Sequence, residues 1–374
     1  MADDRERQPA ECGISVDGTE ISDMYPYLRE VQVAMSRRGA TTGTLTFDSV
    51  RLEDGSWSVQ DAGVFEAWKG ITIEAAFGDN REEVMRGYIK EVRSEYPEDM
   101  SSARVTVSVQ DQSLALDREH ERRNWSTTDS PMTDGDIASS IASDHDLDST
   151  ADPGLTNASL NMDGTYVRFL QDRAEANGFE FYVREGTLYF HAPKLGQNPV
   201  SEPIRVYAGA ATNCLRFSAQ YDGHKPDQVA VTRSAESGTD SDESVYSPNL
   251  QLLGTTAANS ESRGLPPFVW RMQAPNGATA DEVQSRAQAK ANENAWKITA
   301  EGELDGALYG HVLLTHTLVV VDGAGDTNDG TYYVDEVQHH FSLEGYRQGF
   351  KLLRNATGND STASAPSPIE SVIA

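Results

Sequence analysis

Apolar and polar residues alternate with a period of two near the start of the chain. A polar turn at 37–42 separates two such stretches, with Leu28, Val31, Val33 and Met35 before it and Leu45 and Phe47 after it. This alternation predicts a hairpin of half-buried strands. Further strands are expected at 71–77, 87–96 and 104–109. Five or six short antiparallel strands in about 100 residues are typical of a small barrel or sandwich.

The same alternation returns after residue 205. We expect one hairpin with strands at 215–221 and 229–232 and a turn at 222–227, followed by strands at 312–321, 331–341 and 346–353. Two β domains are therefore predicted, one near each end of the chain.

The two halves also carry an internal repeat. Five positions correspond at an offset of 245 residues, pairing Tyr88, Ile89, Glu91, Val92 and Tyr96 with Tyr333, Val334, Glu336, Val337 and Phe341. The early strands align at the smaller offset of 187, through Leu28 and Leu215. The second copy must therefore contain a longer insertion. A polar stretch at 234–262 is expected to be a mobile surface loop, and 279–296 a capped helix.

The segment at 134–193 has a different pattern. Helical periodicity at 134–142 and 165–177 is followed by a hairpin at 179–191. Gly178 is the expected C-cap of the second helix. The predicted fold class is β-rich α+β, with two antiparallel β-barrel domains separated by a small α+β domain. The expected boundaries are a flexible N-terminus at 1–12, the first barrel at 13–120, the α+β domain at 121–205, the second barrel at 206–355 and an extended C-terminal tail at 356–374.

Charge narrows the classes of partner. The 374 residues carry 31 basic and 59 acidic side chains, a net charge of −28. So acidic a chain repels phosphate, which argues against sequence-specific nucleic-acid binding and against charge-driven binding to anionic membranes. Many carboxylates with only 7 Lys favour a halophilic host, although an ordinary acidic protein has the same signature. No secretory signal or membrane span is evident, so we expect a protein made in the cytoplasm.

Catalytic motifs do not emerge from the sequence. Cys12 and Cys214 form neither a disulfide framework nor a metal site, and we expect Cys214 in the core. His339 and His340 would face opposite sides of a strand. The acidic stretch at 322–329 is better explained as a hairpin loop than as a calcium loop, because the distal Glu of an EF-hand is missing. We therefore expect no catalytic residue, no metal and no cofactor.

The segment at 165–193 carries a recognisable pattern. An aromatic–x–x–Phe-Leu helix is followed by an Ala-Glu-x-x-Gly-Phe cap and by a Phe-Tyr-x-x-x-Gly-x-Leu-Tyr-Phe hairpin. This arrangement resembles the late-control D family of phage proteins and the hub halves of VgrG-type spikes and contractile injection particles. The stretch at 330–355 is similar to the family's last barrel. The resemblance spans about 13–355. The protein would then come from a haloarchaeal virus or injection particle.

The resemblance implies a baseplate hub. Such hubs are homotrimers whose two tail-tube-like barrels per chain give a ring of six, adapting the sixfold tail tube to the threefold spike and lining the delivery channel. The implied partners are the tail tube protein, a spike or tip protein and other baseplate proteins. The implied location is a virion tail or injection particle assembled in the host cytoplasm. An acidic channel wall would repel DNA during ejection.

The C-terminal tail is the expected contact with the spike. Its polar linker ends in an apolar tip, which can dock on a partner. The candidate interface residues are Pro366, Pro368, Ile369, Val372 and Ile373. Two alternatives stay open at this point: a secreted halophilic β-domain adhesin, and an acidic-site glycoside hydrolase that would use two carboxylates.

Overall fold

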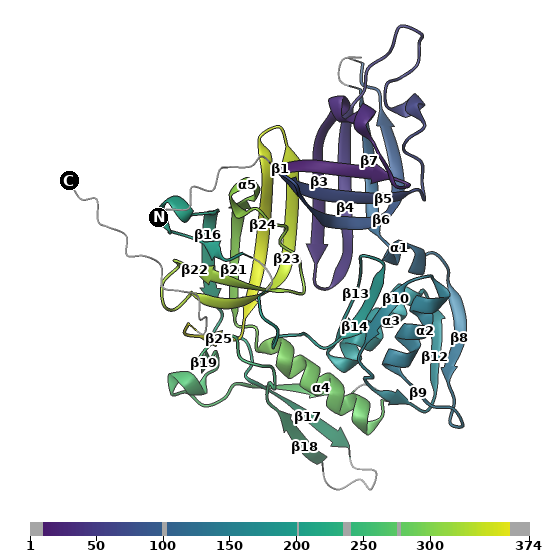
Figure 1. Ribbon diagram of the computed structural model, residues 1–374. Helices are drawn as coiled ribbons and strands as arrows, with labels where there is room; N and C mark the ends of the chain where they lie inside the picture. Colours follow the sequence, from purple (N-terminus) through teal and green to yellow (C-terminus); the bar gives the residue numbers. More distant parts are fainter. Residues whose placement is uncertain (1–9, 99–102, 200–201, 235–240, 275–277, 360–374) are drawn as a thin grey trace, which may run out of the picture.

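The fold is seen in a computed structural model that describes residues 10–98, 103–199, 202–234, 241–274 and 278–359. It has four regions, which we call the first β module, the middle domain, the second β module and the insertion (Figure 1). The predicted fold class, β-rich α+β with two antiparallel β domains around a small α+β domain, is confirmed. None of the helices in these ranges is long and apolar enough to cross a bilayer.

The first β module alternates as the sequence predicts, with Val31, Val33, Leu45 and Phe47 all facing the core. Its long strands exceed the predicted bounds by a few residues. The strands are β1 (Ala10–Val16), β2 (Thr19–Glu20), β3 (Leu28–Ser36), β4 (Gly39–Asp48), β5 (Gly70–Phe77), β6 (Asn80–Glu95) and β7 (Arg104–Asp111).

The middle domain has its own core beneath two helices. The Thr165 hydroxyl caps α3 by accepting from the Arg168 amide, and Gly178 ends it in the left-handed region at φ 67°. Its elements are α1 (Ser113–Leu116), β8 (Glu121–Ser126), β9 (Met132–Thr133), α2 (Asp134–Asp144), β10 (Asp148–Ala151), β11 (Thr156–Asn157), β12 (Leu160–Gly164), α3 (Tyr166–Asn177), β13 (Glu180–Arg184) and β14 (Thr187–His191).

The second β module is interrupted by the insertion. The module consists of β15 (Ile204–Arg205), β16 (Cys214–Tyr221), β21 (Ile298–Asp305), α5 (Gly306–Tyr309), β22 (Leu318–Asp322), β23 (Gly330–Ser342) and β24 (Gly345–Arg354). The insertion, between β16 and β21, contains β17 (Gln228–Ser234), β18 (Ser241–Tyr246), β19 (Thr256–Ala257), β20 (Val269–Gln273) and α4 (Ala280–Asn294), and β19 pairs with β25 (Ala356–Thr357). The helix expected at 279–296 is α4, capped by the Thr279 hydroxyl.

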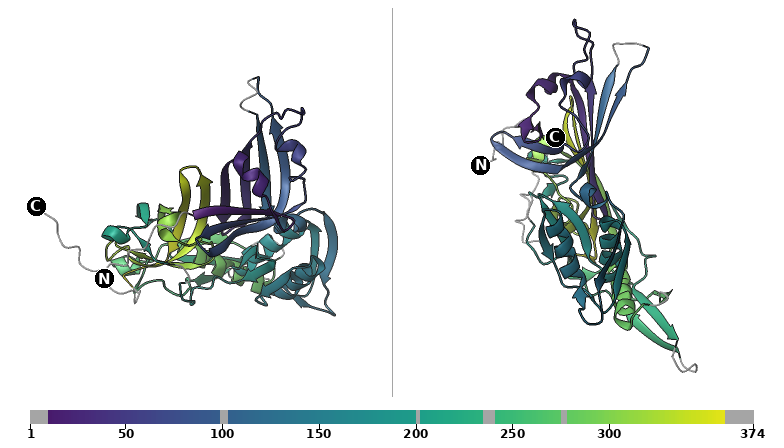
Figure 2. Two further views of the ribbon diagram at one scale, coloured as in Figure 1. Left: turned by 45° about the horizontal axis from the view of Figure 1, so that its top comes forward. Right: turned by 90° about the vertical axis from the view of Figure 1, so that its right-hand side faces the viewer.

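Both modules belong to one 13-stranded sheet. Its order runs β16-β21-β24-β23 from the second module directly into β3-β4-β7-β6-β5-β1-β2 of the first. The middle domain and the insertion lie side by side on one side of this sheet, where α3 contacts α4 (Figures 1 and 2). The two β domains are thus joined by backbone pairing between β3 and β23 as well as by the chain.

The two modules repeat the same strand order with the same register. The order β3-β4-β7-β6-β5-β1 in the first corresponds to β16-β21-β24-β23-β22-β15 in the second, except that β1 runs antiparallel to β5 whereas β15 runs parallel to β22. A β-bulge lies between Ile89 and Glu91 in β6, and another between Val334 and Glu336 in β23, at the predicted offset of 245. Bulges break the register at defined points, so their coincidence indicates true structural equivalence.

Three sequence-based expectations are wrong. The strands at 215–221 and 229–232 do not form a hairpin, because β16 pairs with β21 and β17 pairs with β18 and β20. In the region expected to be only loop, Ser241–Tyr246 forms β18. The early alignment is also off by one residue. β3 pairs with β4 as β16 pairs with β21, and superposing these two ladders matches Val31 with Phe217, an offset of 186. Only that offset keeps the core-facing side chains of the two strands on the same face of the sheet.

Candidate interaction surfaces

The junction between the modules is an antiparallel ladder of β3 and β23. Residues 30–36 pair with 336–342. On the core side Val31 faces Phe341, Val33 faces His339 and Met35 faces Val337, and all six side chains are buried. On the other side the His340 imidazole lies 3.2 Å from the Glu30 carboxylate. Backbone pairing and an apolar face therefore hold the modules together.

A buried ion cluster closes one end of this junction. The Arg37 guanidinium, 7% exposed, lies 3.0 Å from Asp335 of β23, 3.4 Å from Glu180 of β13 and 3.3 Å from Glu293 of α4. The cluster therefore joins both modules, the middle domain and the insertion. Glu180 also accepts a hydrogen bond from the Tyr333 hydroxyl. Burial raises the pKa of Glu180 to about 7, although Arg37 opposes that shift.

The histidines at 311, 316 and 339 have separate partners. His339 is 1% exposed, and its Nδ1 lies 2.8 Å from the Tyr346 hydroxyl. Burial lowers the pKa of His339 to about 3, which keeps the ring neutral. His311 pairs with Glu82 at 2.7 Å, and His316 stacks on Tyr182 at 3.7 Å between ring centres. Within the described ranges no three His, Cys, Asp or Glu side chains are grouped to hold a metal ion.

The remaining candidates from the sequence have structural partners or fall outside the described ranges. Cys214 is buried in the core, as predicted. The acidic loop connects β22 and β23, and the Asp329 carboxylate accepts the Ala324 amide at 2.7 Å inside it. The tail residues Pro366, Pro368, Ile369, Val372 and Ile373 lie outside the described residues.

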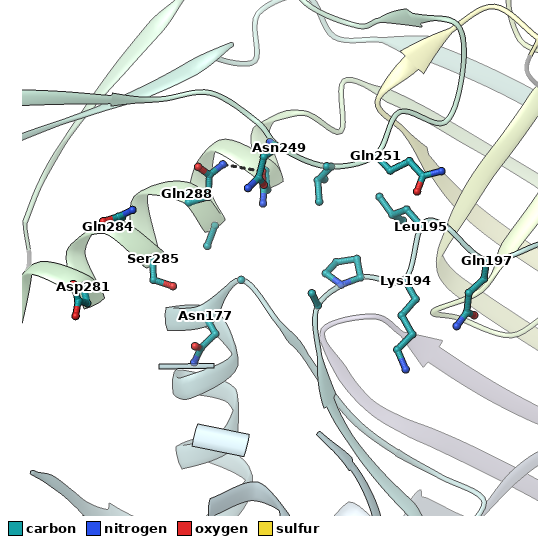
Figure 3. A pocket seen from close by; sticks show the side chains of 17 residues that line it. Asn177, Lys194, Leu195, Gln197, Asn249, Gln251, Asp281, Gln284, Ser285 and Gln288 are labelled. Atoms are coloured by element: carbon teal, nitrogen blue, oxygen red, sulfur yellow. Dashed lines mark hydrogen bonds between the residues drawn. The ribbon is translucent and has the colours of Figure 1, made fainter. Parts of the chain in front are cut away.

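An open cleft of about 930 Å³ lies between the end of α3, α4 and the loops after β14 and β18 (Figure 3). Carboxamides dominate its lining. The Gln288 side-chain amide donates a hydrogen bond to the Asn292 side-chain oxygen at 3.1 Å and another to the Ser247 carbonyl at 2.8 Å. These amides therefore already form hydrogen bonds with one another and with the backbone. Asp281 is the one carboxylate in the lining. Glycoside hydrolysis needs two carboxyl groups, so this cleft does not fit that chemistry.

A second cleft, of about 730 Å³, contains Glu180 and Glu293 next to Trp270 and Trp296. A raised pKa beside another carboxylate is typical of an acid–base pair. Both Glu180 oxygens are already taken, however, one by Arg37 and the other by Tyr333. Glu293 likewise pairs with Arg37 and with Arg38. These carboxylates are ion-pair partners at a domain junction, which leaves neither positioned to protonate a substrate.

Several strand edges of the sheet have no neighbour within the described residues, among them those of β16 and of the last part of β6. β16 ends the strand order, and β6 runs past β5, whose pairing stops at Tyr88. The edge at 91–95 of β6 is therefore paired on the β7 side alone. Large apolar side chains on or beside these edges are exposed, with Tyr96 at 56%, Leu215 at 52% and Tyr221 at 36%. Unpaired edges are natural sites for strand addition.

The junction and the cluster around Arg37 were missed by sequence reasoning. Arg37 appears in the sequence as one polar residue of a turn, and its three acidic partners lie at least 143 positions away. The repeat at offset 245 was the available signal for the open edges, because it matches the paired β23 to the part-open β6.

The fold is shared with phage tail proteins. The 43 kDa tail protein of prophage MuSo2 from Shewanella oneidensis superposes with a TM-score of 0.68 at 14% identity, over 92% of this chain and 98% of that one. A tail protein from Neisseria meningitidis gives 0.64 at 14% identity, over 94% and 98%. An E. coli component of the type VI secretion system gives 0.55 at 9% identity, over 93% and 79%.

Sequence comparison gives two results. No curated protein matches the chain. Residues 6–342, most of the chain, match the family described as the Alg8 N-terminal domain. That description states no reaction, substrate or partner, so function has to be argued from the fold and its surfaces. By sequence, the chain belongs to the Alg8 N-terminal domain family.

Proposed function

We propose that the protein is a structural hub subunit of a phage-like tail or injection particle, with no catalytic role. Three chains form a ring in which six β modules meet a sixfold tail tube on one side and a threefold spike on the other. The observation that carries this proposal is the repeated strand order and register of the two modules. A sixfold-to-threefold adaptor needs two equivalent units per subunit.

The fold likeness supports the same proposal. The Shewanella and Neisseria proteins are named as tail proteins, and the E. coli protein as a secretion-system component similar to bacteriophage T4 tail proteins. Membership of the late-control D type, a halophilic host and a DNA-conducting channel are further parts of the proposal. They are supported by the 165–193 motif and by the net charge of −28.

The C-terminal tail is proposed to contact the spike or tip protein through Pro366, Pro368, Ile369, Val372 and Ile373. Its composition supports this role, because a polar linker with an apolar tip gains stability by docking on a partner. Deleting 361–374 is expected to weaken spike attachment while the chain remains trimeric. Unchanged spike attachment would contradict the contact.

The proposal is tested by the mass of the purified chain in molar KCl and by its assembly with tail tube subunits. We expect a particle of three times 40.8 kDa that caps tube ends in electron micrographs. A chain that stays monomeric at micromolar concentration, or tubes that never carry it, would overturn the hub function. Neither a secreted adhesin nor a glycoside hydrolase is favoured by a specific feature of the structure.

A further inference from the structure

The equivalence of the modules extends to the register of three ladders of the sheet. Pairing of β3 with β4 corresponds to β16 with β21, and pairing of β4 with β7 to β21 with β24. Pairing of β6 with β7 corresponds to β23 with β24. Each of these three ladders repeats in register, so the paired residues of β3, β4, β7 and β6 have defined counterparts in β16, β21, β24 and β23.

One contact breaks this equivalence within the chain. β3 pairs with β23, but their counterparts β16 and β6 do not pair with each other. They are the first and eighth strands of the sheet order, and seven strand spacings separate them by roughly 34 Å along the sheet. The two edges of one chain therefore cannot meet in this sheet, whereas edges of two different copies can.

Applying the offsets to the β3–β23 register gives a defined contact. Val31 facing Phe341 becomes Phe217 facing Tyr96, Val33 facing His339 becomes Ala219 facing Ser94, and Met35 facing Val337 becomes Tyr221 facing Val92. Two of the three derived pairs are apolar or aromatic. The Glu30–His340 contact becomes Arg216 with Glu95, a cation beside an acid.

We infer that β16 of one chain adds to the β6 edge of a second copy, antiparallel, with Ala219 opposite Ser94. This inference deepens the proposed function and rests on it, because it assigns the strands that close the ring. The contact joins two different surfaces, so it does not form a two-fold dimer, and three copies close into a ring when each is rotated by a third of a turn. It covers the exposed Tyr96 and Tyr221, whose counterparts Phe341 and Met35 are buried in the junction within one chain.

The contact between copies lacks the ion cluster of the junction. The counterparts of Arg37 and Asp335 are Gly223 and Lys90, which form no ion pair. Strand pairing, the apolar face and the exposed Arg216–Glu95 pair are left to hold the copies together. The contact between copies is therefore the weaker of the two, and it can form after each chain has folded.

Disulfide trapping tests the register. In the full chain with Cys12→Ala and Cys214→Ala, the pair Ser94→Cys and Ala219→Cys should oxidise to covalent dimers and trimers on non-reducing gels. Ser94→Cys with Gln220→Cys, which points to the other face, is the matched control and should give about tenfold less. Gln32→Cys with His340→Cys, directly opposite in the junction, should form an internal disulfide and confirms that the chain is folded.

The mass in solution separates the two proposals. A trimer that cross-links at 94 and 219 supports both. A trimer that cross-links only in the control register, or not at all while the internal disulfide forms, overturns this contact and leaves the hub function standing. A monomer without cross-links, in a chain that forms the internal disulfide, overturns both.

Discussion

The two β modules keep one backbone register while exchanging the side chains that fill it. Across four strands of the first module, Val31, Leu45, Val107 and Val92 lie in one row. The equivalent row of the second is Phe217, Gly302, Phe350 and Val337. A Cβ on Gly302 would lie 2.2 Å from the Arg216 carbonyl oxygen and 2.4 Å from the Phe350 ring, so both the close approach of β16 and the larger ring require a glycine here. Total volume and register are conserved here, and residue identity is not.

The modules also differ in how their first strands are held. β3 is paired with β23 and closed by the buried Arg37 cluster, whereas β16 is an exposed edge with Gly223 at the position equivalent to Arg37. The same strand position is thus permanently closed in one module and available in the other. The β3–β23 junction therefore holds one subunit together, whereas the β16 edge is free to join two subunits.

Removing the cluster should have the largest effect. Arg37→Ala leaves Glu180, Glu293 and Asp335 without their shared cation, and breaking a buried charge pair costs about 3–5 kcal/mol. Denaturant unfolding should show this loss of stability. Arg38→Ala is the matched control, because Arg38 is mostly exposed and should cost about 1 kcal/mol or less. Equal losses in the two variants would contradict the special role of the cluster.

The cluster should also make the junction sensitive to pH. The folded-state pKa of Glu180, about 7, lies above the 4.5 of an ordinary Glu. Between these values the unfolded chain loses its proton first, so stability falls as pH rises from about 4.5 to 7 and is level above that. The fall contributed by Glu180 is about 3 kcal/mol. Unfolding curves for the wild type and Glu180→Gln should therefore converge or cross with pH; parallel curves would contradict the assignment.

Much of this architecture follows from the sequence, and the limits have physical causes. Period-two alternation identifies the buried face of each strand, and the caps Thr165 and Thr279 identify helix starts. Alternation does not identify a strand's neighbour, so the pattern predicts β17 as the partner of β16, whereas the partner in the structure is β21. Likewise a charged residue in a turn, such as Arg37, carries no sign of acidic partners far along the chain.

Exchanging side chains between equivalent rows tests the first comparison. Gly302→Leu copies Leu45 of the first module into a site already filled by Phe350, and overpacking should cost about 1–3 kcal/mol. Adding Phe350→Val, which copies Val107, should recover only the part of that loss caused by the ring, because the Arg216 carbonyl oxygen would still lie 2.2 Å from the new Cβ. Gly349→Ala is the control, since its nearest neighbour, the Gln338 Cβ, lies 3.5 Å away. Additive losses in the double variant would mean that the two rows are not equivalent.

The charge pair between copies should give the smallest effect. Glu95→Lys places a cation diagonally across from Arg216, and Arg216→Glu places an acid diagonally across from Glu95, where the junction has His340 and Glu30. A cross-strand ion pair contributes roughly 0.2–1 kcal/mol, so each single change should weaken trimer association a few-fold. The double exchange restores opposite charges and should return most of the affinity, measured by sedimentation over a dilution series. If the two effects simply add, the side chains do not meet, because non-additivity is what reports contact between residues.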